Sequence, residues 1–371
     1  MSCHHRLPLA VLVLSTAVAF GQPAALPRIQ ISADGKTFVV AGTKTPFRPW
    51  GANYGNDNRL LEDVWEKDWA TLESDFRELK ALGANVVRVH LQFGKFMDAA
   101  DKPNEKALER LGKLLELAAK TELYLDVTGL GSYRKADVPA WYDKLDDASR
   151  WAAQANFWEA VAKRCNGNPV VFCYDLMNEP VVPSGKRTAG DWLSGKPLGG
   201  YDFVQYIALD QGERQRPDVA VAWIKALKAA IRKHDKQTFI TVGQLPTIPK
   251  WGHFSGFVPE KVAPELDFIS VHIYPEKDKK AEALATLREF AVVGKPLVIE
   301  EIFPLKCTPA ELKEFMLESR GTACGWIGHY DGMTLTEYDA LKAANKLTLP
   351  QGLWREWLML FRDLRAELVE K

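Results

Sequence analysis

The sequence has no excess of either charge: 48 lysine and arginine residues balance 48 aspartate and glutamate residues. Proteins that bind nucleic acid or anionic membranes usually do so through strongly basic surfaces. A chain of 371 residues with zero formal net charge therefore argues against either as the main partner. An uncharged ligand does not require a basic binding surface.

Cysteine is also scarce, with five residues, of which Cys3 lies close to the N-terminus. The remaining four do not have the spacing of a zinc site. We expect Cys173, inside an apolar run, to be a buried small side chain, whereas Cys307 and Cys324 are one possible disulfide pair. No His-Glu-x-x-His pair, glycine-rich phosphate loop or serine elbow is present, so the sequence indicates neither a metal site nor a cofactor.

Long apolar runs are confined to the N-terminus. His4, His5 and Arg6 precede an apolar segment over residues 7–20, which is too short for a membrane span of about 20 residues. Small residues around Gly21 fit a cleavage site, with residues 17–19 as the alternative. We predict a signal peptide over residues 1–21 and a secreted or periplasmic protein that leaves the membrane after cleavage. An uncleaved anchoring helix is the other interpretation.

Residues 22–371 are predicted to form a single domain that begins with a β-hairpin over residues 29–40, turning at Asp34-Gly35. Short apolar runs then alternate with longer helical patterns. The apolar runs cover residues 47–53, 85–91, 123–128, 170–177, 239–242, 268–273, 296–301 and 324–329. The main helical patterns cover residues 69–82, 106–120, 148–164, 219–234, 281–292, 309–319 and 353–369.

Eight strands, each followed by a helix or long loop, are the number that a closed (β/α)8 TIM barrel requires. An open doubly wound sheet would usually carry a phosphate loop after its first strand. Residues 181–217, rich in glycine, proline and aromatic residues, follow the fourth strand. We expect this long segment to form a wall or lid over the open end of the barrel.

The C-terminal ends of the predicted strands carry the chemistry, because these ends surround the active site of a barrel. Glu179 follows the fourth strand, and Glu300 and Glu301 end the seventh. A protonated and an ionised carboxyl group facing each other suit cleavage of a glycosidic bond. Other polar residues at strand ends are Arg88, His90, Thr128, Asn178, Gln244, His272, Tyr274 and His329.

Four motifs in barrel order resemble glycoside hydrolase family 5, the cellulase and mannanase family of the clan A barrels. The fourth strand carries the most specific one, from Phe157-Trp158 through Asn168-Pro169 to the Asp-Leu-Met-Asn-Glu-Pro run over residues 175–180. The others are Asn-Val-Val-Arg at 85–88, Val-His-Ile-Tyr at 271–274 and the run from Lys295 to Phe303. The likeness extends from about residue 47 to residue 329, and it implies a retaining glycoside hydrolase.

The resemblance implies roles for individual residues. Glu179 corresponds to the acid/base, and Asn178 to the residue that binds the sugar 2-hydroxyl. The register of the seventh strand favours Glu301 over Glu300 as nucleophile, with Glu300 a buried neighbour. A helix-capping or surface glutamate is the alternative for Glu179, and an ordinary core ion pair is the alternative for Arg88.

Further resemblance points to the groups around these carboxylates. Arg88 and Tyr274 are expected to keep the nucleophile ionised, and His272 to line the sugar site. The eighth strand should supply an aromatic platform, which is Trp326 or, in another register, His329. Trp141, Trp192 and Trp251 in loops are weaker candidates for sugar stacking.

The predicted partner is therefore a carbohydrate, with no nucleic acid partner and a monomeric state expected. A β-linked mannan-type polysaccharide or oligosaccharide is the first substrate hypothesis, and β-glucan the next. The alternatives are an exo-acting clan A β-glycosidase and a carbohydrate-binding barrel with altered catalysis. The latter stays open because the third strand ends in Thr128, where many family members have histidine.

Overall fold

A computed structural model describes residues 26–193, 198–247 and 255–370. Eight strands form a closed barrel in which every neighbouring pair is parallel. In chain order they are β4 (Trp50–Tyr54), β5 (Val86–Gln92), β8 (Tyr124–Gly131), β9 (Val171–Asn178), β12 (Phe239–Gln244), β13 (Ile269–His272), β14 (Leu297–Glu301) and β15 (Gly325–Tyr330). The barrel closes between β15 and β4, so the (β/α)8 prediction is confirmed.

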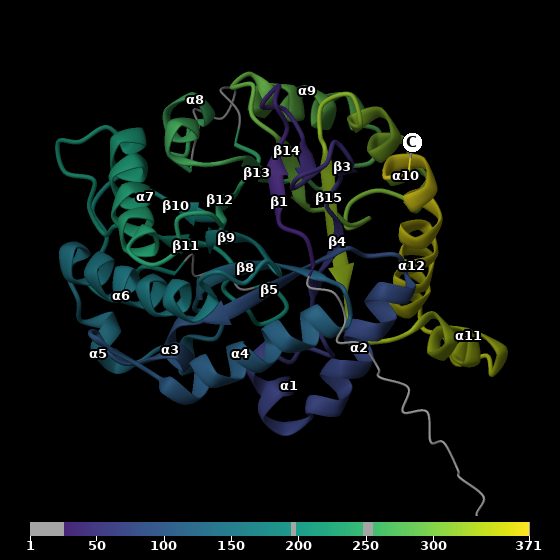
Figure 1. The fold of residues 1–371 in the computed structure, drawn as a ribbon, viewed down its shortest axis with the longest axis horizontal. Coiled ribbons are helices and arrows are strands. Elements are labelled where there is room, and N and C mark those ends of the chain that lie inside the picture. The colour runs from purple at the N-terminus through teal and green to yellow at the C-terminus, as the bar shows by residue number, and fades with distance from the viewer. Residues whose placement is uncertain (1–25, 194–197, 248–254, 371) are drawn as a thin grey trace, which may run out of the picture.

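Helices surround the barrel (Figure 1). Apolar side chains of the strands and of these helices form one buried cluster. The principal helices are α1 (Leu61–Lys67), α2 (Trp69–Ala81), α4 (Glu105–Lys120), α6 (Asp147–Cys165), α7 (Arg216–Arg232), α9 (Lys280–Ala291), α10 (Pro309–Ser319), α11 (Leu335–Ala343) and α12 (Leu349–Leu368). Seven of them match the predicted helical patterns, whereas α1 and α11 were not predicted. No helix within the described residues is both long and apolar enough to span a membrane.

The helices begin where the sequence supplies a cap. Asn104 accepts from the amide of Ala107 at the start of α4, at 3.0 Å. At α10, Thr308 and Glu311 bond each other's backbone amides in a capping box. These caps satisfy amides that have no partner within the helix, and so fix where each helix starts.

A small antiparallel sheet closes the N-terminal end of the barrel. The predicted hairpin forms β1 (Ile29–Ile31) and β2 (Phe38–Val40), and β3 (Pro46–Phe47) joins as a third strand. Because residues 46–47 pair with β2, the first barrel strand starts at Trp50, three residues later than predicted. Phe38 packs against barrel residues Phe172 and Phe268, with ring centroids 5.2 and 5.3 Å apart.

The four cysteines beyond the N-terminal segment are free, so the disulfide considered for Cys307 and Cys324 is wrong. Cys307 lies in the loop that follows β14, near the open end of the barrel, whereas Cys324 precedes β15 at the opposite end. The helix α10 separates them along the chain. Cys173 is buried inside β9, as predicted.

Candidate active site

Two carboxylates meet at the open end of the barrel. Glu179 directly follows β9, and Glu301 is the last residue of β14. One oxygen of each carboxylate and a ring nitrogen of His272 lie within 4.8 Å of one another. Retaining glycosidases hold their carboxyl groups about 5–5.5 Å apart, and inverting enzymes about 6.5–9.5 Å apart. The approach of Glu179 to Glu301 therefore fits direct attack by a carboxylate on a sugar carbon.

Glu179 has a strained backbone, with a positive φ of 47°. A left-handed conformation at a non-glycine residue costs energy, and such residues cluster at functional sites. Its amide donates to the carbonyl of Gly243 on β12, at 2.9 Å, and Pro180 follows at once. The turn ends β9 while the carboxylate stays beside the neighbouring strand.

Glu301 is held as a carboxylate. Arg88 Nη1 donates to its Oε1 at 2.7 Å, and the Tyr274 hydroxyl donates to its Oε2 at 2.6 Å. Burial by itself raises the pKa of Glu301, but the positive charges of His272 and Arg88 outweigh burial and hold that pKa well below its usual value. An ionised carboxylate is the form that a nucleophile requires.

Arg88 connects the strands beneath the two carboxylates. Its guanidinium is fully buried and donates to Asn53 Oδ1 and Asp175 Oδ2, both at 2.7 Å, and to Asn178 Oδ1 at 3.0 Å. The Asn53 amide in turn donates to the carbonyl of Glu300 at 3.0 Å. A planar donor with this many fixed acceptors holds the ends of β4, β5, β9 and β14 in one arrangement.

His272 lies between both candidate catalytic carboxylates. Its Nδ1 is 2.9 Å from Glu179 Oε1 and 3.4 Å from Glu301 Oε2, while Nε2 is 3.6 Å from Glu300 Oε2. Burial alone lowers the pKa of His272, but the three surrounding carboxylates outweigh burial and raise it to about 10. The imidazole is therefore positively charged at neutral pH, and it lies beside the ionised Glu301.

His329 and Tyr274 form the other side of the site. The Tyr274 hydroxyl lies 2.8 Å from His329 Nε2, and the two rings stack with centroids 6.0 Å apart. Burial lowers the pKa of His329 to about 4, so this ring is neutral at neutral pH. A neutral His329 can donate its Nε2 hydrogen to the Tyr274 oxygen, which leaves the phenol hydrogen for Glu301.

A second acidic layer lies inside the barrel, below the site. Asp126, Cys173 and Glu300 meet there, and both carboxylate oxygens of Asp126 are buried without a hydrogen-bond partner among the described residues. Burial, followed by the charge of Glu300, raises the pKa of Asp126 well above its usual value. Ligating atoms of these three residues lie within 4.8 Å of one another, as do those of Glu179, His272 and Glu301. Either group could hold a metal ion by distance.

Asn178 is brought to the site but is largely committed to the protein. Its Oδ1 accepts from Arg88, and its Nδ2 donates to the carbonyl of Phe203 at 3.1 Å. One amide hydrogen is left for a sugar hydroxyl. The role expected for Asn178 therefore stays a prediction.

Trp326 is not at the site, so its expected place as a sugar platform is wrong. It is 1% exposed, it packs 6.4 Å from Trp50 between strands and helices, and its ring nitrogen donates to Ser319 of α10. Side chains alternate along a strand, and Ile327 points into the barrel, so Trp326 must point outward. His329, two residues beyond Ile327, reaches the site instead.

The loop tryptophans do not form an exposed stacking surface among the described residues. Trp192 is buried and donates to Asp143. Trp141 packs against Phe93, with ring centroids 5.8 Å apart. Trp251 lies outside the described residues.

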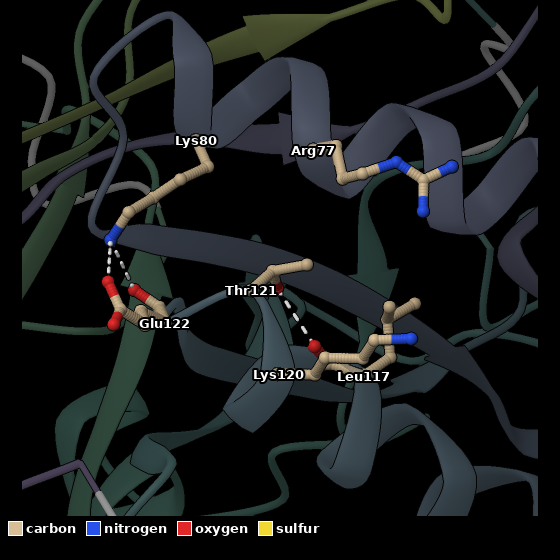
Figure 2. A pocket seen from close by; sticks show the side chains of 6 residues that line it. All are labelled: Arg77, Lys80, Leu117, Lys120, Thr121 and Glu122. Atoms are coloured by element: carbon tan, nitrogen blue, oxygen red, sulfur yellow. Dashed lines mark hydrogen bonds and ion pairs between the residues drawn. The ribbon is translucent and has the colours of Figure 1, made fainter. Parts of the chain in front are cut away.

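A depression of about 300 Å³ on the molecular surface is unrelated to this site. Its lining comes from the C-terminal parts of α2 and α4 and from the turn before β8 (Figure 2). These parts lie at the N-terminal ends of the strands, and the carboxylates lie at the C-terminal ends. The lining residues are Arg77, Lys80, Leu117, Lys120, Thr121 and Glu122.

The family model for cellulase (glycosyl hydrolase family 5) matches residues 31–302. This chain belongs to glycoside hydrolase family 5. It is accordingly a glycoside hydrolase of the retaining type, and its substrate is a carbohydrate. No curated protein sequence matches the chain.

Solved structures resemble this family 5 fold at low sequence identity. An exo-β-1,4-mannosidase from Opitutaceae bacterium strain TAV5 has a TM-score of 0.65 and 16% identity, and the match covers 92% of this chain and 63% of that one. A β-1,4-mannanase from the sea hare Aplysia kurodai has a TM-score of 0.61 and 14% identity, covering 91% and 97%. A β-mannanase from the blue mussel Mytilus edulis has a TM-score of 0.60 and 16% identity, covering 92% and 97%. This chain thus spans less than two thirds of the first enzyme.

Several residues of the family 5 site escaped the sequence prediction. Asn53 and Asp175 bind Arg88, and Tyr133 donates to His90 Nδ1 at 2.6 Å while His90 faces Asn53. Asp175 carried a signal, since a carboxylate inside an apolar strand requires a buried partner. Tyr133 carried none, because it lies in a loop whose path the sequence does not specify.

Proposed function

We propose that this family 5 enzyme cleaves β-linked mannan-type polysaccharide or oligosaccharide, with Glu301 as nucleophile and Glu179 as acid/base. The observation that carries the proposal is the close approach of an ionised Glu301 to Glu179, within 4.8 Å. The mannose preference is supported by the mannosidase and mannanases among the similar structures, and by the doubled Glu300-Glu301, which resembles fungal mannanases.

The reaction proceeds in two displacements at the anomeric carbon. A Glu301 oxygen forms a bond to this carbon as the glycosidic bond breaks, and Glu179 gives its proton to the departing oxygen. Esterification removes the charge of Glu301, so Glu179 is left as the carboxylate. It then takes a proton from water, whose oxygen attacks the same carbon and releases Glu301.

β-Glucan is the second candidate substrate, because the matching family model describes cellulases. The two sugars differ in the configuration of the 2-hydroxyl, the group expected to face Asn178. Parallel mannosyl and glucosyl reagents therefore separate the two candidates.

We also propose that residues 1–21 direct export and that the mature enzyme is a monomer in the periplasm or outside the cell. The apolar segment that supports export lies outside the described residues. N-terminal sequencing of the protein recovered from each compartment tests this proposal. A product that retains Met1 in the membrane fraction would contradict it.

The assignment of the nucleophile is tested with 2-deoxy-2-fluoro-mannosyl and -glucosyl fluorides, followed by peptide mass spectrometry. We expect the faster reagent to label Glu301, and Glu301→Gln to lose labelling and at least about 1,000-fold of kcat. Glu300→Gln is the matched control and should still be labelled at Glu301. An adduct on Glu300, or a first-formed product of inverted configuration by NMR, would contradict the mechanism.

A further inference from the structure

Residues 198–206, which we call the strap, return toward the barrel after the long excursion that follows β9. The strap begins with a tight turn in which Leu198 and Tyr201 exchange backbone hydrogen bonds of 2.9 and 3.1 Å. Gly199 and Gly200 form the turn with φ of 60° and 89°, which side chains disfavour. It ends at β11 (Gln205–Tyr206), which pairs with β10 (Pro180–Val181) beside the fourth barrel strand.

The tip of the strap is fixed to the loop after the first barrel strand. The Tyr201 hydroxyl donates to the carbonyl of Asn58. Arg134, from the loop after β8, donates to the same Asn58 carbonyl at 3.1 Å, to the Tyr201 oxygen at 3.2 Å and to Asp63 at 2.6 Å. Its guanidinium also lies over the Tyr201 ring, 5.4 Å from the centroid. Loops after the first, third and fourth strands are thereby joined.

The middle of the strap reaches the candidate active site. The Phe203 carbonyl accepts from Asn178, the residue before Glu179, at 3.1 Å. The Asp202 amide donates to the carbonyl of Tyr133 at 2.8 Å, and the Phe203 and Tyr133 rings pack edge to face at 5.1 Å. Tyr133 in turn donates to His90, on the second barrel strand. The strap therefore extends along one side of the site, from the fourth strand to the first.

A polysaccharide that continued past this side would have to displace these contacts. The strap crosses the ends of β5 and β8, which lie between β4 and β9 in the barrel. The side formed by β13, β14 and β15 carries the half-buried Tyr274 and His329 and is not crossed by the strap. A groove blocked on one side binds the end of a chain and excludes its interior.

We propose that the strap makes this enzyme exo-acting, so that it removes single sugars from the non-reducing end of its substrate. This inference rests on the proposed function. The blocked side is the glycone side, because the strap bonds Asn178, the residue expected to face the 2-hydroxyl of the sugar attacked by Glu301. The contact lies one residue from Glu179, so the strap borders the position of the sugar that Glu301 attacks.

The decisive substrates are β-1,4-mannotetraose and β-1,4-glucotetraose, each labelled at the reducing end and each with or without a methyl group on the terminal non-reducing 4-oxygen. We expect the wild-type enzyme to convert the uncapped substrate to labelled trisaccharide and monosaccharide first. Capping should reduce the rate at least 100-fold. Early formation of labelled disaccharide, or equal cleavage of capped and uncapped chains, would overturn the proposal.

A variant tests the strap directly. Tyr201→Ala removes the anchor at Asn58, and we expect it to cleave capped tetraose internally at 10-fold or more the wild-type rate. Tyr206→Ala on the same segment is the control, because the Tyr206 ring packs under Arg187, at 3.8 Å, instead of on the anchor. An internal cleavage rate equal in both variants would contradict the role of Tyr201.

Failure of the proposed function gives a different pattern. If neither tetraose nor any aryl glycoside were hydrolysed, the proposed catalysis would be disproved. The affinities for capped and uncapped tetraose could still be compared. Glu301→Gln should then bind uncapped tetraose at least 10-fold more tightly than capped tetraose by calorimetry. Equal affinities would overturn the strap proposal independently of turnover.

Discussion

At the scale of single residues, the candidate active site contains more acidic than basic side chains. Two buried cations, Arg88 and His272, face more carboxylates than they can neutralise. The carboxylates are Asp126, Asp175, Glu300 and Glu301. Pairs of acids whose surroundings push their pKa values apart are the usual basis for separate acid and base roles. Here Glu301 stays ionised because it takes the strongest donors, while Asp126 keeps a proton because it has none.

The proton on Asp126 predicts a pH-dependent effect of Asp126→Asn. The raised pKa of Asp126 means that folding takes up a proton above about pH 4, so this residue costs stability as pH rises toward its folded pKa. Asparagine mimics the protonated acid without that cost. We expect the free energy of unfolding of the variant, relative to wild type, to rise by up to about 1.4 kcal/mol per pH unit above pH 4.

Urea denaturation at pH 4.5, 6 and 7.5 measures this difference. Asp175→Asn is the contrasting variant, because burial raises the pKa of Asp175 only to about 6 and its carboxylate accepts from Arg88, so its pH-dependent effect should level off above about pH 6. A destabilisation by Asp126→Asn that grew with pH would mean that Asp126 is ionised beside Glu300.

Tyr274 predicts a change in the acid limb of the pH–rate profile. Tyr274→Phe removes the hydroxyl that donates to Glu301, so the pKa of Glu301 should rise and the acid limb should move to higher pH. Loss of one such donor also lowers kcat by about 100-fold. Tyr142→Phe, which removes a buried hydroxyl bonded to Gln154 outside the site, should leave both unchanged. An unmoved acid limb in Tyr274→Phe would contradict the assigned role.

At the scale of elements, the strands approach so closely at the site that some positions accept no side chain. A Cβ at Gly243 of β12 would lie 2.8 Å from Arg88 Nη2 and from His272 Nε2, and 2.9 Å from Glu300 Oε2. The pairing of β12 with β9 also shifts register between Thr241 and Gly243, which directs β9 into the turn at Glu179. The backbone of β12 is therefore one wall of the charge network.

Gly243→Ala should displace that network. We expect a loss of about 1–3 kcal/mol in the free energy of unfolding, together with a lower kcat, because overpacking moves Arg88 and His272. Gly321→Ala is the control, since nothing lies within 4 Å of a Cβ there. Thermal unfolding and initial rates on an aryl glycoside measure both effects. An unchanged kcat in Gly243→Ala would show that the network tolerates the shift.

At the scale of the whole molecule, the barrel is closed at one end and reactive at the other. The N-terminal sheet places Phe38 among Phe172, Phe239 and Phe268, at the N-terminal ends of the strands. Hydrophobic residues fill this end, and the polar network fills the other. The residues that stabilise the fold and the residues of the candidate active site thus lie at opposite ends of the barrel.

This separation predicts that Phe38→Ala destabilises the protein by about 3–5 kcal/mol and leaves kcat unchanged below the unfolding transition. Its neighbour Val39 is only partly buried, so Val39→Ala should cost less than half as much. Denaturant unfolding and kcat at a temperature where the variant is folded provide the comparison. A large change in kcat for Phe38→Ala would contradict the separation.

The sequence by itself determined the barrel and the identity of the two candidate catalytic carboxylates. Strands and helices have different hydrophobic periods, and the eight predicted strands lie within a few residues of those observed. Strand ends carry the polar groups of any such barrel, so Glu179, Glu301, Arg88 and His272 could be selected from position and family motif together. Both the strand positions and the polar residues at strand ends follow from the local sequence pattern, and tertiary packing did not change them.

Only the tertiary structure decided which side each remaining residue faces and what it contacts. Trp326 and His329 were both candidates until closure of the barrel fixed the inward register at Ile327. The raised pKa of Asp126 depends on burial and on Glu300, which is 174 residues away in the chain, and Tyr201 contacts Asn58, which is 143 residues away. Such contacts depend on the path of the folded chain, because no local periodicity encodes them.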